Sequence, residues 1–366
     1  MLTWALRIKT QRRGAEDLEK ILTEFLINPS AAISSSIENS DAWVFPFCER
    51  VFSAPLRLCV GCGLKGFYMS FFFEVLIGGL LAGVMYSLVA LGFVLIYKAS
   101  GVFNFAQGAM VFLAALTFVG LQEKTGMPFW AVLVLTLGVM VALGIVTERI
   151  VLRPLVNQPQ ITLFMATIGL AFFLEGAAQM IWGTDVRPLD LGIKDEPIEA
   201  LMTRFDMVIS KFDVIAAGVA GLLVATLAIF FNKTRIGRAL RAVADDHQAA
   251  LAVGIPLKTI WAIVWSVAGF VALVAGLMWG ARNGVQFALT FVALKALPVL
   301  ILGGFESVAG AIVGGLIIGA SEKLAEVYLG PHVGGGIEGW FAYVMALLFL
   351  LIRPEGLFGE KHIDRV

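Results

Sequence analysis

Long apolar stretches fill the chain after residue 68 and constrain its fold more than any other feature. A helix of about 20 apolar residues crosses a bilayer, and backbone groups inside lipid must find hydrogen-bond partners within the protein. Because several stretches are short or rich in glycine, eight or nine are expected to cross. The predicted fold is an all-α, polytopic bundle of about 8–9 transmembrane helices. The stretches are residues 75–97, 102–121, 128–147, 162–182, 214–231, 260–280, 287–303, 307–327 and 337–352.

The composition agrees with a membrane protein. Hydrophobic residues make up 59% of the chain and charged residues 15%, whereas soluble domains carry about 25% charged residues. Glycine, with 39 residues, is abundant inside the apolar stretches, where small residues let helices approach closely. Two glycine pairs have the GxxxG spacing of such contacts: Gly310 with Gly314, and Gly315 with Gly319. The formal net charge is zero, so nothing argues for a nucleic-acid partner.

Residues 1–68 differ from the rest of the chain. They contain no apolar stretch long enough to span a membrane, and they lack the build of a signal peptide. Met69 opens the first apolar stretch, so we expect translation to begin at or near it, with 1–68 as an extension and 69–366 as the functional domain. The cysteine pair Cys59 and Cys62 has CxxC spacing, but no second pair or nearby histidine completes a metal site.

The segment 234–256 is the longest cationic, alanine-rich interruption between apolar stretches. Thr234 is a suitable N-cap for one helix, Asp246 for a second, and Gly254 with Pro256 would end the second. Two capped helices between spans indicate a docking element, although a solvated loop that follows charge bias fits equally well. The first helix is expected to carry Ile236, Leu240 and Val243 on one face and Arg235, Arg238 and Arg241 on the neighbouring face.

Lysine and arginine in the connections predict the orientation. If residues 232–259 are cytoplasmic and the spans alternate, the inner side carries more lysine and arginine than the outer side. This bias predicts a cytoplasmic C-terminus and, with nine spans, an N-terminus outside. The connection 183–213 is then the longest outer loop and a reasonable surface for an extracytoplasmic partner.

A few polar residues fall inside the predicted spans. Asn104 and Gln107 lie three apart on one helical face, where amides either bond between helices or line a wet cavity. Lys295 lies near the middle of a span and needs a counter-charge, for which we expect Glu175. Pro298 should break the helix locally and free carbonyls that help to satisfy the ammonium. Such a pair is either a structural clamp or part of a proton relay.

Motifs of enzymes are missing from the sequence. It contains no GxxxxGK[ST] phosphate loop, HExxH or GxSxG, so neither nucleotide hydrolysis nor these forms of hydrolase chemistry are expected. Asp245, Asp246 and His247 are adjacent, and adjacent helical residues point in different directions. Capping therefore explains them better than metal binding.

Four blocks carry a resemblance to a known family. They are residues 78–110, 234–255 (TRIGRALRAVADDHQAALAVGI), 293–322 and 353–359 (RPEGLFG). In this order the chain resembles, over about residues 70–360, the membrane permease subunits of ABC importers for branched-chain (hydrophobic) amino acids, the LivH type. The resemblance implies a multi-pass protein of the bacterial inner membrane that translocates its substrate by alternating access.

The resemblance also implies partners. They are a LivM-like second permease, two cytoplasmic ATP-binding subunits that use the ATP, and a periplasmic substrate-binding protein, while this chain binds no cofactor and is not an enzyme. Segment 234–256 matches the family's coupling region, so Gly237 and Ala239 would permit close docking and Arg238 and Arg241 would meet the ATPase. The expected coupling set is Gly237, Arg238, Ala239, Arg241, Asp245 and Asp246.

Other readings stay open at this stage. Permeases of this family also carry urea, amides or aromatic acids, and the family commonly has a histidine at the position of Gln107, so no pH-sensitive role carries over there. A self-sufficient secondary transporter would use Glu175 and Lys295 as its coupling pair. Asn104, Gln107, Glu175 and Lys295 are therefore candidates for the translocation path or for contacts between helices. A structural scaffold has only the glycine packing in its favour.

Overall fold

The computed structural model describes residues 55–155, 158–245 and 247–359. The chain divides into two units, Met1–Phe67 and Tyr68–Val366. In the first unit the described residues are helical, and the proposed extension otherwise lies outside the described part of the chain.

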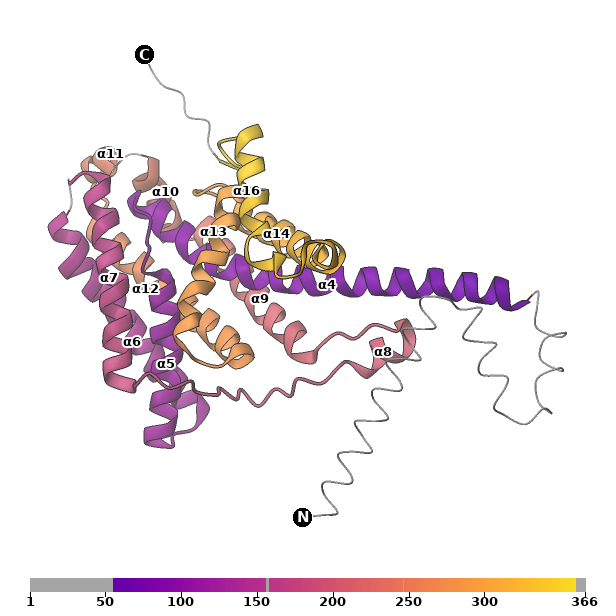
Figure 1. The fold of residues 1–366 in the computed structure, drawn as a ribbon. Coiled ribbons are helices and arrows are strands. Elements are labelled where there is room, and N and C mark those ends of the chain that lie inside the picture. Colours follow the sequence, from indigo (N-terminus) through magenta and orange to yellow (C-terminus); the bar gives the residue numbers. More distant parts are fainter. Residues whose placement is uncertain (1–54, 156–157, 246, 360–366) are drawn as a thin grey trace. The chain divides into compact units, whose positions relative to one another are not determined.

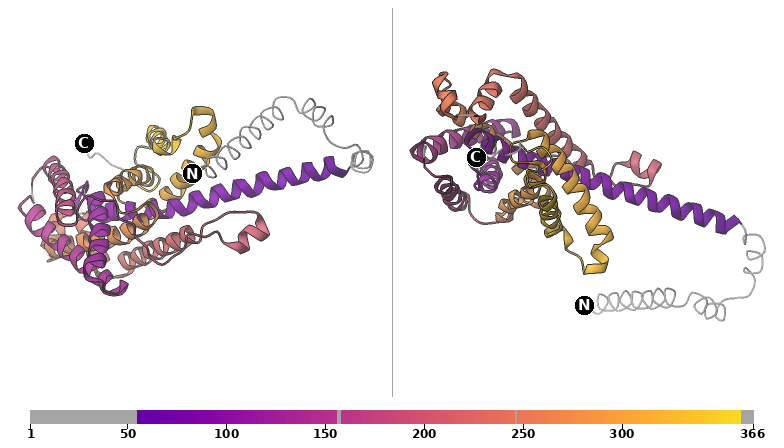
Figure 2. Two further views of the ribbon diagram at one scale, coloured as in Figure 1. Left: turned by 60° about the horizontal axis from the view of Figure 1, so that its bottom comes forward. Right: turned by 90° about the horizontal axis from the view of Figure 1, so that it is seen from above.

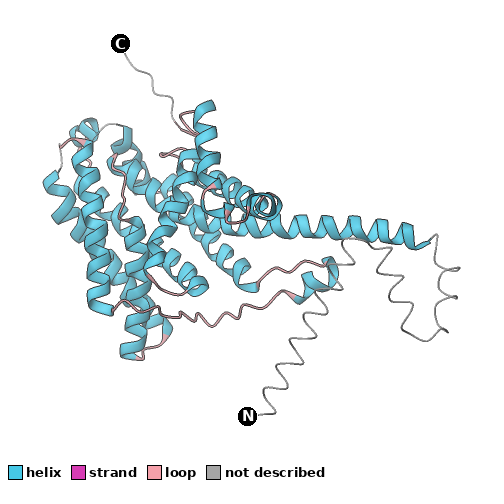
Figure 3. Cartoon of the chain, viewed as in Figure 1, coloured by secondary structure: helices cyan, strands magenta, loops and turns pink. Residues whose placement is uncertain are grey.

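A helix occupies each of the nine expected apolar stretches (Figure 1). The described residues contain no strand, only the isolated bridges Arg187–Val285 and Pro197–Ser210 (Figure 3). The all-α prediction is confirmed. The helices are α4 (Pro55–Ser100), α5 (Gln107–Thr125), α6 (Phe129–Val146), α7 (Gln160–Trp182), α9 (Lys211–Lys233), α12 (Leu257–Asn283), α13 (Val292–Gly303), α14 (Val308–Tyr328) and α16 (Phe341–Ile352).

The helices differ in length and exposure. Six described helices are long and apolar enough to cross a membrane, while Phe287–Gly303 and Phe341–Ile352 are shorter. The apolar windows of α6 and α7 are 22% and 28% buried inside the protein, against 78% for that of α4. Helices α6 and α7 therefore present apolar surface of the kind that lipid or another membrane subunit covers.

Helix α5 forms the centre of one part of the bundle. Its residues from Gln107 to Gly120 are all buried, and it packs against α6, α7 and α12 (Figure 1). The expected span over 102–121 is partly wrong, because 101–106 is a loop and the helix begins at Gln107. Gly101 adopts a positive φ of 66°, which turns the chain out of α4.

Glycines bring α14 into contact with two other helices. A Cβ on Gly83 of α4 would lie 2.5 Å from the carbonyl oxygen of Gly315, so the two backbones touch. A Cβ on Gly314 would lie 2.7 Å from the carbonyl oxygen of Val299 on α13. Both GxxxG pairs therefore support tight helix packing, as predicted, and α14 lies beside α4 in the views of Figures 1 and 2.

Contacts between helix ends show that the helices alternate in direction. On one side, Lys98 at the end of α4 donates to the carbonyl oxygen of Glu306 before α14 (3.2 Å), and Trp261 near the start of α12 donates to that of Ala99 (3.0 Å). We call this the coupling side, because the 234–256 segment lies at the α9–α12 connection there.

The opposite ends meet on the other side. Arg282 at the end of α12 forms an ion pair with Asp213 at the start of α9 (2.7 Å), and Arg187 pairs with Glu123 near the end of α5 (2.5 Å). We call this the loop side, because it holds the long connection 183–210, including the short helix α8 (Glu199–Phe205).

Candidate functional site

Segment 234–256 forms the two-helix element expected from its sequence. Helix α10 (Arg235–Asp245) begins at Thr234, whose hydroxyl accepts a hydrogen bond from the backbone N–H of Gly237 (3.1 Å). Helix α11 (His247–Ala252) follows, and Gly254 with a φ of 86° ends it before α12. Asp246 lies outside the described residues, as does the side chain of Asp245, so the structure does not place these two carboxylates.

The apolar face of α10 packs on the bundle. Leu240 and Val243 are 2% and 0% exposed, and the helix contacts α9 and α12. The helical spacing of these residues in the sequence therefore marked the buried face correctly.

Two residues of the expected coupling set, Gly237 and Arg241, contact their own chain. Gly237 is buried, and a Cβ there would overlap the backbone of Phe231 at the end of α9. The Arg241 guanidinium donates to the carbonyl oxygen of Phe231 (3.0 Å) and to the side-chain oxygen of Asn232 (3.3 Å). Arg241 thereby satisfies a carbonyl that the end of α9 leaves without a helical partner. Both residues therefore attach α10 to α9, and their predicted docking roles stay predictions.

The exposed face of the element carries a different set. Arg235 and Arg238 are exposed, and Ala239 is half-buried. Leu251 and Val253, at the end of α11 and just after it, are 55% and 81% exposed, so the element also presents apolar side chains. We call Arg235, Arg238, Leu251 and Val253 the coupling surface. Its two apolar members were not predicted, although both lie just before Gly254, the residue expected to end the second helix.

Lys295 lies in a cluster of charged groups on α13, α14 and the following connection. Its Nζ donates to Glu322 Oε1 and to Glu338 Oε1, at 3.1 Å each, and lies 3.5 Å from the hydroxyl of Tyr86. Glu322 is 3% exposed as a side chain and also accepts from the Tyr86 hydroxyl at 3.4 Å. Lys323 reaches the other oxygen of Glu338 at 3.8 Å. These residues form the polar cluster.

The predicted partner of Lys295 was wrong. Glu175 is on α7, which packs against α5, whereas α13 packs against α14 and α16. The counter-charges come from Glu322 of α14 and from Glu338 in the 3₁₀ turn η4 (Ile337–Gly339). Glu322 falls inside the predicted span 307–327, so a carboxylate at membrane depth was a signal that could have identified it.

Pro298 acts differently from the prediction as well. Helix α13 continues through Pro298, which removes the N–H that would bond the carbonyl of Leu294 four residues earlier. The Tyr343 hydroxyl of α16 donates to that carbonyl oxygen at 2.8 Å. The freed carbonyl thus binds α16 to α13 and does not serve Lys295.

Asn104 and Gln107 are completely buried, and their described bonds are local. Asn104 accepts from the backbone N–H of Ala106 (3.1 Å) and donates to the Gln107 side-chain oxygen (3.4 Å). The link between helices comes instead from Thr167 of α7. Its hydroxyl accepts from the N–H of Phe105 (3.3 Å), and its single proton is shared between the carbonyl oxygens of Phe164 in the same helix (2.8 Å) and Phe103 (3.1 Å). Thr167 was missed, since a lone threonine in a span carries no positional signal.

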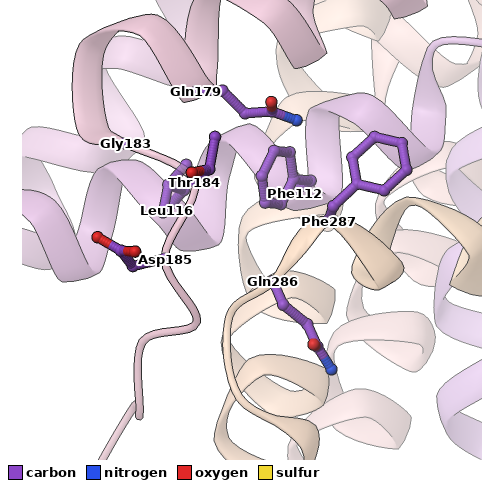
Figure 4. A pocket seen from close by; sticks show the side chains of 8 residues that line it. All are labelled: Phe112, Leu116, Gln179, Gly183, Thr184, Asp185, Gln286 and Phe287. Carbon is purple, nitrogen blue, oxygen red and sulfur yellow. The ribbon is translucent and has the colours of Figure 1, made fainter.

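Several cavities open on the loop side, and two of them reach α4 or α5. The first has a volume of about 390 Å³ and lies between α5, α7 and the segment before α13 (Figure 4). The rings of Phe112 and Phe287 meet edge to face there, at 6.3 Å, and Asp185 supplies a carboxylate. Figure 4 also shows the amides of Gln179 and Gln286 at this cavity.

The second cavity, of about 260 Å³, adjoins the polar cluster. Tyr86 and Trp279 form part of its wall with their rings stacked at 5.5 Å and inclined by 16°. Lys295, Lys323 and Glu338 also line it. This cavity therefore combines both signs of charge with an aromatic surface.

Comparison with known proteins identifies the family. The family model "Branched-chain amino acid transport system / permease component" matches residues 75–353. The permease LivH of Salmonella typhimurium and BraD of Pseudomonas aeruginosa, both of high-affinity branched-chain amino acid transport systems, are each 27% identical, over 81% of this chain and 98% of theirs. The fructose import permease FruF of Bifidobacterium longum is 26% identical, over 74% of this chain and 75% of its own. The chain therefore belongs to the permease family of branched-chain amino acid transport systems.

Proposed function

We propose that the chain is the membrane-spanning permease subunit of an ATP-driven importer of branched-chain or related small amino acids. The observation that carries this proposal is a helical bundle joined to a separate two-helix element with an exposed cationic and apolar face. The sequence contains no phosphate-binding loop, so a separate ATPase would supply the free energy of ATP hydrolysis in this proposal.

The coupling surface suits a partner with acidic groups around an apolar depression. Arg235 and Arg238 would meet carboxylates or carbonyls, while Leu251 and Val253 would lose water on contact. The contacts of Gly237 and Arg241 fix α10 to the end of α9. A push on the coupling surface would therefore move α9 and its neighbours together and would not simply bend a loop, which is what alternating access requires.

The remaining partners follow from the family. They are two cytoplasmic ATP-binding subunits, a LivM-like second permease that covers part of the exposed apolar surface, and a periplasmic substrate-binding protein. In this assembly the coupling side faces the cytoplasm. Residues 357–358 bond to the end of α13 on that same side, which supports a cytoplasmic C-terminus. The excess of lysine and arginine in those connections supports the orientation.

Branched-chain amino acids are favoured as substrates by the family and by LivH and BraD. Fructose, as carried by FruF, and the amides, urea and aromatic acids handled by related permeases are the competing substrates. The alternative of a self-sufficient secondary transporter has lost its coupling pair, because Lys295 bonds Glu322 and Glu338 and not Glu175.

The docking role is tested by reversing one exposed charge. Arg238→Glu should abolish ATP-dependent uptake of L-leucine by the complete importer, with membrane insertion and amount of protein unchanged, because a carboxylate would face the acidic partner. Arg204→Glu is the matched control, since Arg204 is equally exposed on the loop side. Uptake is measured in cells with radiolabelled leucine. Normal uptake by Arg238→Glu, or equal losses in both variants, would contradict the docking role.

A further inference from the structure

The cavity beside the polar cluster has the size and position of a site for a small solute. Its volume is about 260 Å³, just below the roughly 300 Å³ at which pockets for drug-sized ligands begin. It is lined by residues of α4, α12, the 3₁₀ turn η3 (Phe287–Phe291), α13, α14 and η4, and it lies on the loop side, where Arg282 closes the end of α12. The cavity therefore faces the side from which an importer receives its substrate.

Glu338 stands between two cations in this cavity. Its Oε1 is 3.1 Å from the Lys295 ammonium and its Oε2 is 3.8 Å from that of Lys323. All three side chains are between 35% and 38% exposed, so a solute can reach them. Glu326 of α14 accepts from the backbone N–H of Glu338 at 2.9 Å, which fixes the turn that presents the carboxylate.

The ion pairs of Glu338 with Lys295 and Lys323 leave room for a zwitterionic ligand. Lys295 keeps Glu322 as a buried partner at 3.1 Å even when Glu338 turns away from it. Glu338 can then bind the ammonium of a ligand, while Lys323, whose contact with Glu338 is long, binds its carboxylate. An α-amino acid carries both groups on its α-carbon, so it would enter without leaving any of these charges unpaired.

An apolar side chain also finds a surface there. The stacked rings of Tyr86 and Trp279 and the side chains of Phe291 and Val292 line the same cavity. Trp279 is 8% exposed, and its indole N–H has no hydrogen-bond acceptor among the described residues. Such a buried donor is satisfied most simply by a water or a ligand oxygen.

We propose that this cavity is a binding subsite for an α-amino acid with an apolar side chain, with Glu338 holding its ammonium and Lys323 its carboxylate. This inference rests on the proposed function and adds the residues that distinguish the substrate. The first cavity is a weaker candidate, because its lining carries the carboxylate of Asp185 and no cation. An uncharged sugar could form hydrogen bonds with these groups but would not neutralise their charges, so the subsite is expected to favour amino acids over fructose.

Direct binding to the purified full-length chain in detergent tests the subsite. Saturation-transfer NMR would follow three probes: L-leucine, 4-methylpentanoate, which lacks the ammonium, and 3-methylbutylamine, which lacks the carboxylate. Glu338→Gln should weaken leucine and the amine at least tenfold and leave the acid unchanged. Lys323→Gln should weaken leucine and the acid and leave the amine unchanged. The exposed loop-side variants Glu196→Gln and Lys194→Gln are the charge-matched controls and should bind like the wild type.

Because each variant should weaken only the probes that carry the charge it recognises, this pattern distinguishes lost ligand recognition from misfolding. Equal weakening of all three probes by both variants, unchanged binding of leucine by both, or no leucine binding by the wild type would overturn the subsite. Uptake by the complete importer distinguishes this failure from failure of the proposed function. If the importer concentrates leucine with an unchanged KM in both variants, the subsite alone is wrong. If the importer carries fructose and not leucine, the proposed substrate class is wrong and the subsite falls with it.

Discussion

Replacing Lys295 by methionine should destabilise the bundle by leaving Glu322 buried without its counter-charge. The Glu322 side chain is 3% exposed and accepts at 3.1 Å from Lys295 and at 3.4 Å from Tyr86. Removing one partner of a fully buried ion pair costs about 3–5 kcal/mol. Because Lys295 is 35% exposed, water already screens part of this attraction, and we expect a loss of about 2–3 kcal/mol.

A second substitution should recover most of that loss. In Lys295→Met/Glu322→Gln the buried group is neutral and can still accept from Tyr86, so the double variant should lie within about 1 kcal/mol of the wild type. Glu338→Gln should have a smaller effect than Lys295→Met, because Glu338 is 38% exposed and Lys295 keeps Glu322.

Unfolding in mixed detergent micelles, followed by tryptophan fluorescence, measures these differences. The wild type, Lys295→Met, Glu338→Gln and the double variant Lys295→Met/Glu322→Gln are compared at constant detergent composition. A Lys295→Met variant as stable as the wild type, or a double variant as unstable as Lys295→Met, would refute the role of Lys295 as the counter-charge of a buried carboxylate.

Two further substitutions test contacts that hold short segments in place. Thr167→Val removes the hydroxyl that contacts the carbonyl oxygen of Phe103, and because Thr167 is completely buried the loss should be about 1–3 kcal/mol, read by the same unfolding assay. Tyr343→Phe removes the donor that satisfies Leu294 below Pro298, at a cost of about 1 kcal/mol because Tyr343 is partly exposed; faster hydrogen exchange in α16 would support this, and unchanged exchange would count against it.

Local features were predictable from the sequence. Apolar length located all nine helices, and the Thr234 cap and the buried pair Leu240 and Val243 followed from residues within one or two turns. The loop 101–106 interrupts an apolar stretch, and hydropathy alone does not detect a backbone turned by Gly101.

Long-range pairing was not predictable to the same degree. Glu175 and Glu322 are both carboxylates in apolar helices, and the choice between them depends on which helices surround α13. The contacts of Arg241 were not predicted, because its acceptors, ten and nine residues earlier, become neighbours only when α10 folds back on α9. In each case tertiary packing decided a role that residue type left open.

The central claim is that this permease moves its substrate only when an external ATPase acts on the coupling surface. Reconstitution in proteoliposomes tests it most directly, with radiolabelled L-leucine outside and ATP on the coupling side. The complete importer with its binding protein should concentrate leucine in an ATP-dependent manner, and the chain alone should show no flux under any ion gradient. Leucine flux through the chain alone, or accumulation by the complete importer without ATP, would contradict the account.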